Sequence, residues 1–339
     1  MPSFAPEACH EPLFETAAKS LAFNPENDYQ QWRKQVDVKL RELIGAQPEK
    51  VPLNLRIQDE KENGLFSEKR FVFTSEAHAD VPGHLVIPKN GESPFPVVIC
   101  LQGHTSGMHI SLGRAKYEGD EESICGDRDF AIQAVREGYA ALVIEQRCFG
   151  ERKDSRPERV QHLKNSCHHA SMSALLLGRT MIGERVGDVS RAIDVLTEFP
   201  EIDPSRIGCM GNSGGGTITY YAACLEPRIG IAMPSGYVCS YLWSLRMIDH
   251  CACNYIPGFM QYFDLADLAG LIAPRPFVIV AGRHDDIFPL DGVKAAFGTI
   301  QQIYQAAGAT DKCRLIIGEE GHRFYAKLAW PVFRELSGW

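Results

Sequence analysis

The second half of the chain alternates between two hydrophobic patterns. From Phe95 onward, short apolar runs are separated by longer stretches in which apolar residues have helical spacing. This alternation is typical of an α/β fold with a mostly parallel sheet and helices on both faces. The predicted strands are Val97 to Leu101, Ala140 to Glu145, Ile207 to Met210, Ile229 to Met233, Phe277 to Ala281 and Arg314 to Ile317.

The stretches between these strands predict amphipathic helices. The clearest is Glu184 to Phe199, where apolar residues fall on one helix face that can pack against the sheet. These residues are Val186, Val189, Ile193 and Leu196. The other predicted helices are Asp129 to Glu137, Gly215 to Cys224 and Asp291 to Ala307.

The first part of the chain has a different pattern. Residues 1–52 are predicted to form an N-terminal helical segment that packs on the body, because Asp28 to Ile44 carries an apolar face. That face consists of Trp32, Val36, Leu40 and Leu43. Residues 53–339 are predicted to form a single domain, whose first strands are antiparallel. Those strands are Leu53 to Ile57, Leu65 to Thr74 and Val81 to Ile87.

Two segments, 147–183 and 235–268, fit neither the strand pattern nor the helix pattern. Both follow predicted strands, at the edge where an open α/β sheet places its ligand-facing loops. The first is highly charged, and the second is rich in tyrosine, phenylalanine and tryptophan. They are interpreted as cap-like insertions, with extra core packing as the alternative for any single aromatic residue.

The charge pattern excludes some classes of partner. The net charge is -8, and lysine and arginine are scattered, which argues against nucleic acid or an anionic membrane as a partner. Residues 1–20 lack the apolar core of a signal peptide, and no stretch has the length of a membrane span. The sequence therefore predicts a cytoplasmic protein with a small-molecule partner, and it is compatible with a homo-oligomer.

The 11 cysteines are interpreted mainly as buried thiols, because most of them lie in apolar runs. One group, Cys239, His250, Cys251 and Cys253, raises the question of a metal. A structural zinc site usually has paired C-x-x-C spacings, which this group lacks. The sequence therefore predicts no metal site, and it leaves the redox state of these three cysteines open.

Candidate chemistry centres on Ser213. Gly211 and Gly215 flank this serine in a G-x-S-x-G pattern, between a predicted strand and a predicted helix. That context is typical of a nucleophile elbow, where glycine permits a sharp turn. Ser213 is therefore the candidate nucleophile.

A serine hydroxyl needs an imidazole base and a carboxylate that orients the imidazole. Three histidines follow Ser213. His284 abuts the acidic pair that would have to orient it, and His250 precedes the last two strands, which leaves His322 as the base. The acid should follow the strand Phe277 to Ala281, where Asp285 and Asp286 are equally suitable on chemical grounds.

An oxyanion hole needs two backbone N–H donors. The first predicted donor is Gly214, directly after the nucleophile. The second should follow the strand Val97 to Leu101, where His104 is the first choice and Gly103 the next.

Together these motifs resemble the α/β-hydrolase superfamily, in the branch that contains acetyl xylan esterases and dienelactone-hydrolase-like esterases. The resemblance spans about Phe95 to Lys327 and implies that Asp285 is the acid. It rests on Gln102-Gly-His104, Glu145-Gln-Arg-Cys-Phe-Gly150, Gly211-Asn-Ser-Gly-Gly215, Gly282-Arg-His-Asp285 with Pro289, and Gly321-His322.

The sequence departs from the family pattern at two motifs. Gln102-Gly103 replaces the usual His-Gly, which is harmless if only backbone amides act. Glu145-Gln-Arg147-Cys148 replaces Asp-x-Arg-Gly, so Arg147 is expected to keep a structural ion pair while the turn differs. Dienelactone hydrolases use a cysteine nucleophile, whereas this chain has Ser213.

The motifs and the resemblance predict a serine carboxylester hydrolase that forms an acyl-enzyme and requires no cofactor. The resemblance implies short acyl groups, with acetyl esters of carbohydrates as candidates. One alternative is a peptidase, although no large gating domain precedes Phe95. Another is a catalytically silent ligand-binding protein, which the intact order Ser213, Asp285, His322 disfavours.

Overall fold

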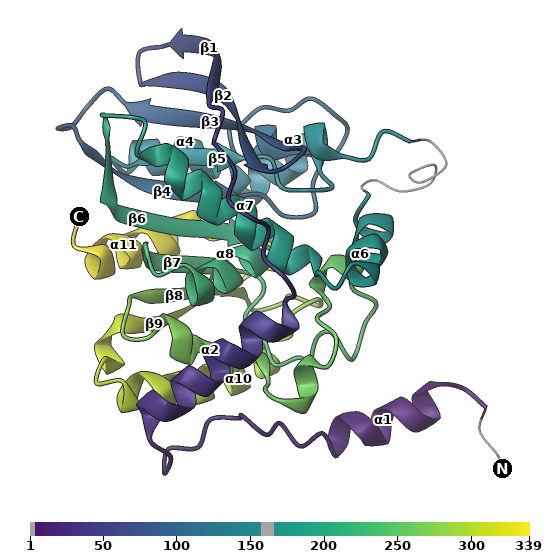
Figure 1. Ribbon diagram of the computed structural model, residues 1–339. Helices are drawn as coiled ribbons and strands as arrows, with labels where there is room; N and C mark the ends of the chain where they lie inside the picture. Colours follow the sequence, from purple (N-terminus) through teal and green to yellow (C-terminus); the bar gives the residue numbers. More distant parts are fainter. Residues whose placement is uncertain (1–3, 157–165) are drawn as a thin grey trace.

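A computed structural model describes residues 4–156 and 166–339 (Figure 1). The described strands form one sheet in the order β1-β2-β3-β5-β4-β6-β7-β8-β9. Strands β1, β2, β3 and β5 pair antiparallel in that order, and the pairs from β5 through β4 to β9 are parallel. The strands are β1 (Arg56–Glu62), β2 (Phe66–Glu76), β3 (Ala79–Pro88), β4 (Phe95–Leu101), β5 (Ala140–Ile144), β6 (Ile202–Asn212), β7 (Ile229–Ser235), β8 (Phe277–Gly282) and β9 (Cys313–Gly318).

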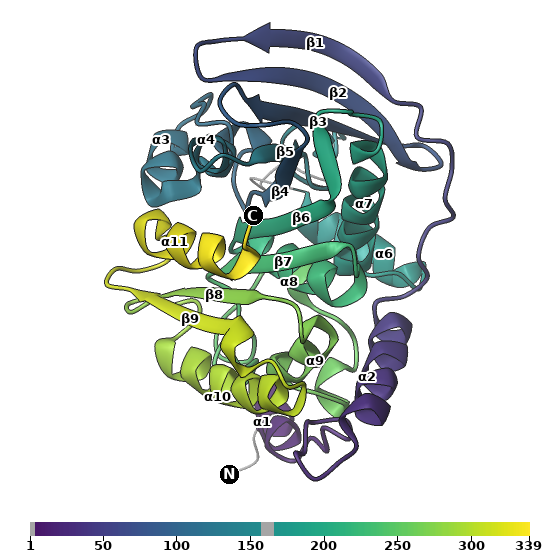
Figure 2. The same ribbon diagram turned by 90° about the vertical axis from the view of Figure 1, so that its left-hand side faces the viewer.

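Helices cover both faces of the sheet (Figure 2). α4 and α11 lie on one face, while α7 and α8 lie on the other. The helices are α1 (Glu7–Glu15), α2 (Tyr29–Leu43), α3 (Asp120–Ser123), α4 (Phe130–Arg136), α6 (Cys167–Leu176), α7 (Met181–Leu196), α8 (Gly214–Leu225), α9 (Ala269–Ile272), α10 (Leu290–Ala306) and α11 (Ala326–Ser337). Between β7 and β8 the chain forms short 3₁₀ turns, including η4 (Ala252–Asn254).

Strands β4, β5 and β8 are apolar along their whole length because both of their faces are buried. In β4, Val97, Ile99 and Leu101 pack with α7 and α8, whereas Val98 and Cys100 pack with α4 and α11. Successive side chains of a strand point to opposite faces, so a strand between two helix layers has no polar face. The predicted α/β fold with a mostly parallel sheet is therefore confirmed.

The N-terminal part of the chain agrees with the sequence only in places. The helix predicted at Asp28 to Ile44 is α2, whose first turn is capped by the Asp28 carboxylate, 2.7 Å from the Gln31 amide nitrogen. α2 buries three apolar residues, whereas α1 buries none. The strand predicted at Leu53 to Ile57 is wrong, because β1 covers Arg56–Glu62 and every residue of β1 is exposed.

No helix within residues 4–156 and 166–339 is both long enough and apolar enough to cross a membrane.

Candidate active site

Ser213 occupies a strained turn between β6 and α8. Its φ of 58° and ψ of −124° are rarely adopted by residues other than glycine. The turn packs tightly against the end of β4, since a Cβ atom on Gly211 or on Gly215 would collide with the Leu101 carbonyl oxygen. The predicted G-x-S-x-G pattern thus has the strand-turn-helix geometry of a nucleophile elbow.

The buried Asp285 and the half-buried His322 form a pair after the ends of β8 and β9. The distance from Asp285 Oδ2 to His322 Nδ1 is 2.7 Å. Asp285 Oδ1 accepts hydrogen bonds from the amides of Ile287 and Phe288, at 2.9 and 3.1 Å. With Nδ1 engaged by the carboxylate, Nε2 is the imidazole nitrogen left to exchange a proton, and this buried atom has no hydrogen-bond partner among the described residues.

The His322 imidazole lies close to the turn that carries Ser213. The Ser213 amide donates to the Ser235 carbonyl at 2.9 Å. The next residue, Gly236, has a φ of 54°, and a Cβ atom there would lie 2.9 Å from Cε1 of His322. Ser213 and the His322 ring therefore both lie against the turn Ser235–Gly236, so the structure places the three predicted triad residues in one region.

The predicted oxyanion donors also lie at this site. A Cβ atom on Gly103 would lie 3.0 Å from the Ser213 Cβ, and one on Gly214 would lie 3.6 Å from the His104 amide nitrogen. Gly214 begins α8, so its N–H has no partner within the helix. The His104 ring reaches Cys253, with Nε2 at 3.2 Å from the Cys253 sulfur.

Comparison with protein-family models identifies the family of this chain. Residues 11–315 match the model of the Abhydrolase family. The chain belongs to the Abhydrolase family. It is 27% identical over 307 residues to YtaP of Bacillus subtilis (strain 168), which is provisionally named a hydrolase, and the match covers 88% of this chain and 96% of YtaP.

Solved structures share the fold of this Abhydrolase-family chain. A glucuronoyl esterase from Solibacter usitatus superposes with a TM-score of 0.72 and 14% identity, covering 95% of this chain and 96% of that one. Acetyl Xylan Esterase 1 from Thermoanaerobacterium sp. JW/SL YS485 gives a TM-score of 0.57 and 15% identity, covering 94% of this chain and 98% of that one. At these identities the likeness establishes the α/β-hydrolase fold alone.

In this Abhydrolase-family chain a buried carboxyl group, Glu145, supports the loop that carries His104, the predicted second oxyanion donor. Its Oε1 accepts from the Gln102 side-chain amide at 2.7 Å and from the Met108 backbone amide at 3.0 Å. Its Oε2 has only a weak contact, 3.4 Å from the Glu151 amide. Burial raises the pKa of Glu145 to about 7, against the lowering effect of the backbone hydrogen bonds. The side chain thus fixes both ends of the loop that carries His104.

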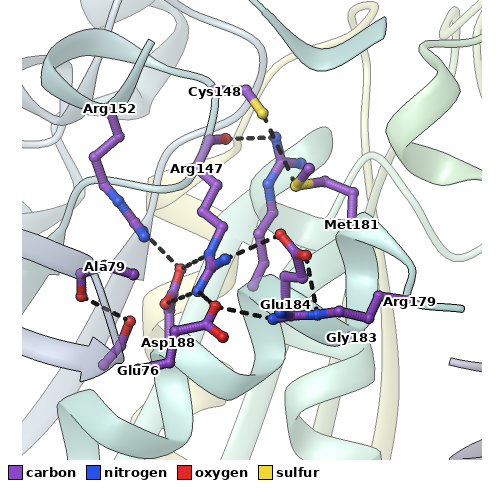
Figure 3. A network of polar contacts seen from close by, with 12 residues as sticks. Glu76, Ala79, Arg147, Cys148, Arg152, Arg179, Met181, Gly183, Glu184 and Asp188 are labelled. Carbon is purple, nitrogen blue, oxygen red and sulfur yellow. Dashed lines mark hydrogen bonds and ion pairs between the residues drawn. The ribbon is translucent and has the colours of Figure 1, made fainter. Parts of the chain in front are cut away.

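Arg147 forms the structural ion pairs that the sequence predicted (Figure 3). Its guanidinium contacts Asp188 at 2.9 Å, Glu184 at 3.0 Å and Glu76 at 2.6 Å, and Arg152 contacts Asp188 at 2.6 Å. Burial by itself lowers the pKa of Arg147, but the three carboxylates raise it. The network joins β2, the loop after β5 and α7. Its role is to hold this loop in place beside the site, and it does not position the reacting atoms themselves.

Asn212 is a site residue that sequence reasoning missed. When the Asn212 side-chain amide is oriented so that each of its polar atoms has a partner, its NH₂ donates to the Arg323 carbonyl at 3.2 Å and to Ser235 Oγ at 2.8 Å. In that orientation its carbonyl oxygen accepts from the Ser213 amide at 3.2 Å. One amide therefore links the serine turn to the loop of His322. In the sequence Asn212 fills a variable position of the motif, so no pattern marked it.

The remaining candidates for the triad lie elsewhere. Asp286 and His284 are exposed. His250 contacts Ser244, with its Nε2 3.0 Å from the serine Oγ, and burial lowers the pKa of His250. Of the two adjacent aspartates, Asp285 is thus the one whose carboxylate contacts His322.

The cysteine group named from the sequence does not form one cluster. Cys251 and Cys253 are close, with their sulfur atoms 3.3 Å apart. Cys239 instead faces the Pro289 carbonyl at 3.8 Å.

A cavity of about 1110 Å³ opens beside His104 and His322. Most of its described lining comes from residues 104–128, and segment 147–183, of which 157–165 lie outside the described residues, contributes Gly150 and Lys153. None of the described lining residues belongs to segment 235–268. In that segment Tyr237, Tyr241, Phe259 and Phe263 are buried in the core next to α8 and α10.

Proposed function

We propose that this protein is a serine carboxylester hydrolase that works through an acyl-enzyme. The observation that carries the proposal is that the strained Ser213 and the hydrogen-bonded Asp285–His322 pair lie against the same turn after β7, with the His322 Nε2 lacking any hydrogen-bond partner among the described residues. Membership of the Abhydrolase family supports a hydrolase of this kind.

The chemistry follows from these positions. His322 Nε2 removes the proton of the Ser213 hydroxyl as its Oγ attacks the ester carbonyl, and Asp285 holds the imidazole in the required tautomer. The amides of Gly214 and His104 stabilise the oxyanion. His322 then protonates the leaving alcohol, and water attacks the acyl-enzyme by the same route. Water completes the cycle, so the proposed reaction requires no cofactor.

We propose that the substrate is a small polar ester with a short acyl group, such as an acetylated sugar. The cavity beside His104 and His322 is lined largely by polar and charged side chains, which suit hydroxyl groups better than a long acyl chain. Among these are Ser106, Glu118, Asp120, Glu122, Arg128 and Lys153. The names of the compared structures, an acetyl xylan esterase and a glucuronoyl esterase, agree with a carbohydrate ester.

The test combines a substrate panel with a nucleophile variant. Para-nitrophenyl esters of increasing chain length, assayed beside acetylated sugars, should show the highest kcat/KM for acetate. Ser213→Ala should lower kcat by about 10⁶. Ser205→Ala, at an exposed position in β6, the strand that precedes Ser213, should leave kcat unchanged. A preference for long chains would refute the substrate class, and activity retained by Ser213→Ala would refute the nucleophile.

A further inference from the structure

Four potential metal ligands from three separate parts of the chain meet behind the oxyanion loop. They are the His104 imidazole and the thiols of Cys167, Cys251 and Cys253, and their ligand atoms all lie within 4.8 Å of one another. His104 follows β4, Cys167 begins α6, and the other two cysteines lie at η4. This cluster is distinct from the set considered in the sequence, because His104 and Cys167 replace His250 and Cys239.

We propose that His104, Cys167, Cys251 and Cys253 form a structural zinc site.

The spacing of the ligand atoms fits a tetrahedral zinc ion. With Zn–S bonds of about 2.3 Å and a Zn–N bond of about 2.0 Å, tetrahedral geometry separates two sulfurs by about 3.8 Å and a sulfur from a nitrogen by about 3.5 Å. The His104 Nε2 to Cys253 distance is 3.2 Å, and the Cys251 to Cys253 distance is 3.3 Å. Small side-chain movements are enough to place all four atoms around one ion.

A buried arginine supplies the second, independent observation. Arg185 is 2% exposed, and among the described residues it forms no salt bridge with a carboxylate. Its guanidinium lies over the Phe149 ring and donates to the Arg147 carbonyl at 2.8 Å, and its other contacts are with sulfur, 3.3 Å from Cys253 and 3.2 Å from Cys167. A buried cation needs a compensating anion, and a neutral thiol is a poor one.

Zinc resolves this charge imbalance. Binding would displace three thiol protons to solvent and leave three thiolates around the ion, which gives the site a net charge of −1. Arg185 would then neutralise that charge and donate to two of the metal-bound sulfurs, as groups around metal ligands commonly do. Four protein ligands fill a tetrahedral zinc, so the ion would have no open position for substrate.

The site would act on the neighbouring loop through the His104 side chain. Coordination of its Nε2 would fix the residue whose backbone amide is a proposed oxyanion donor, and would tie that loop to α6 and η4. The zinc site does not depend on the proposed function, because metal binding can be measured without any substrate.

The experiment measures zinc in the full-length, tag-free chain. After reduction, incubation with zinc chloride and dialysis, elemental analysis should find about one zinc per chain in the wild type. Cys253→Ser and Cys251→Ser should retain little, and Cys239→Ser, a buried cysteine of the same segment outside the cluster, should match the wild type. Equal zinc content in all four proteins, or none in the wild type, would overturn the proposal.

A second measurement covers the case in which a cluster variant fails to fold. Cobalt added to the reduced wild-type chain should give the intense visible absorption of a tetrahedral thiolate complex, and one equivalent of zinc should abolish it. A weak spectrum typical of octahedral oxygen ligation would refute the site. A Cys251–Cys253 disulfide that persists under reduction would refute it as well.

Discussion

Replacing Glu145 with glutamine should change how stability depends on pH. Burial raises the pKa of this carboxyl group from 4.5 to about 7 in the folded chain. The folded state therefore binds the proton more tightly than the unfolded state. The stabilisation is complete below about pH 4.5 and is lost as the pH rises towards 7.

The size of the Glu145 pKa shift sets the size of this change in unfolding free energy. Each pKa unit corresponds to about 1.4 kcal/mol, so the shift of Glu145 should cost the wild type about 3 kcal/mol of unfolding free energy across this range. Glutamine should remove this contribution at a small cost. Its carbonyl oxygen can replace Oε1, which receives both strong hydrogen bonds, and only the 3.4 Å contact of Oε2 is lost.

Urea unfolding at pH 5 and pH 8 measures this contribution. The difference in unfolding free energy between the two pH values should be about 2.5 kcal/mol smaller in Glu145→Gln than in the wild type, because part of the effect is already lost at pH 5. Glu60→Gln, on the exposed strand β1, serves as the control and should follow the wild type. Identical pH profiles for Glu145→Gln and the wild type would refute the burial argument.

Three further substitutions test the site and its supports. Asp285→Asn should lower kcat by a factor on the order of 10⁴, because the imidazole is no longer held in the tautomer that accepts the serine proton. Asp286→Asn, at an exposed position, should leave kcat near the wild-type value. Arg147→Met should cost about 1.5–3 kcal/mol in urea unfolding, since Asp188 and Glu184 on α7 each lose one of the two arginines that they contact, and a cost below 1 kcal/mol would contradict this role. Gly215→Ala should prevent correct folding of the serine turn, because its Cβ would meet a β4 carbonyl, and circular dichroism with soluble yield would show it. Gly298→Ala, where a Cβ meets nothing within 4 Å in α10, should instead raise the melting temperature.

The parts of the fold that the sequence predicted are those with a strong local signal. β4, β5 and β8, residues 207–212 of β6 and most of β7 are buried, so they appear in the sequence as short apolar runs. β1 has no apolar pattern, because none of its residues is buried. α11 was not predicted, since Pro331 lies inside it and proline normally interrupts a helix.

The sequence predicted those site residues whose role follows from their order along the chain. It did not predict residues whose role depends only on which side chains meet in space. Ser213, Asp285 and His322 follow strands in the order expected of the family. The position of His104 beside Cys167 and Cys253 has no such signal. It depends on how three loops converge in space, and no spacing in the sequence reports that convergence.

The exposed edge strand β1 has a consequence for the behaviour of the whole molecule. An unpaired sheet edge can template the addition of a strand from another chain, which leads to aggregation. Five of the seven residues of β1 are charged, in the sequence RIQDEKE. A second chain that paired there would have to strip water from these charges along the full length of the strand. The polar sequence of β1, which is the reason that this strand was not predicted correctly, thus also prevents further strands from adding to this edge of the nine-stranded sheet.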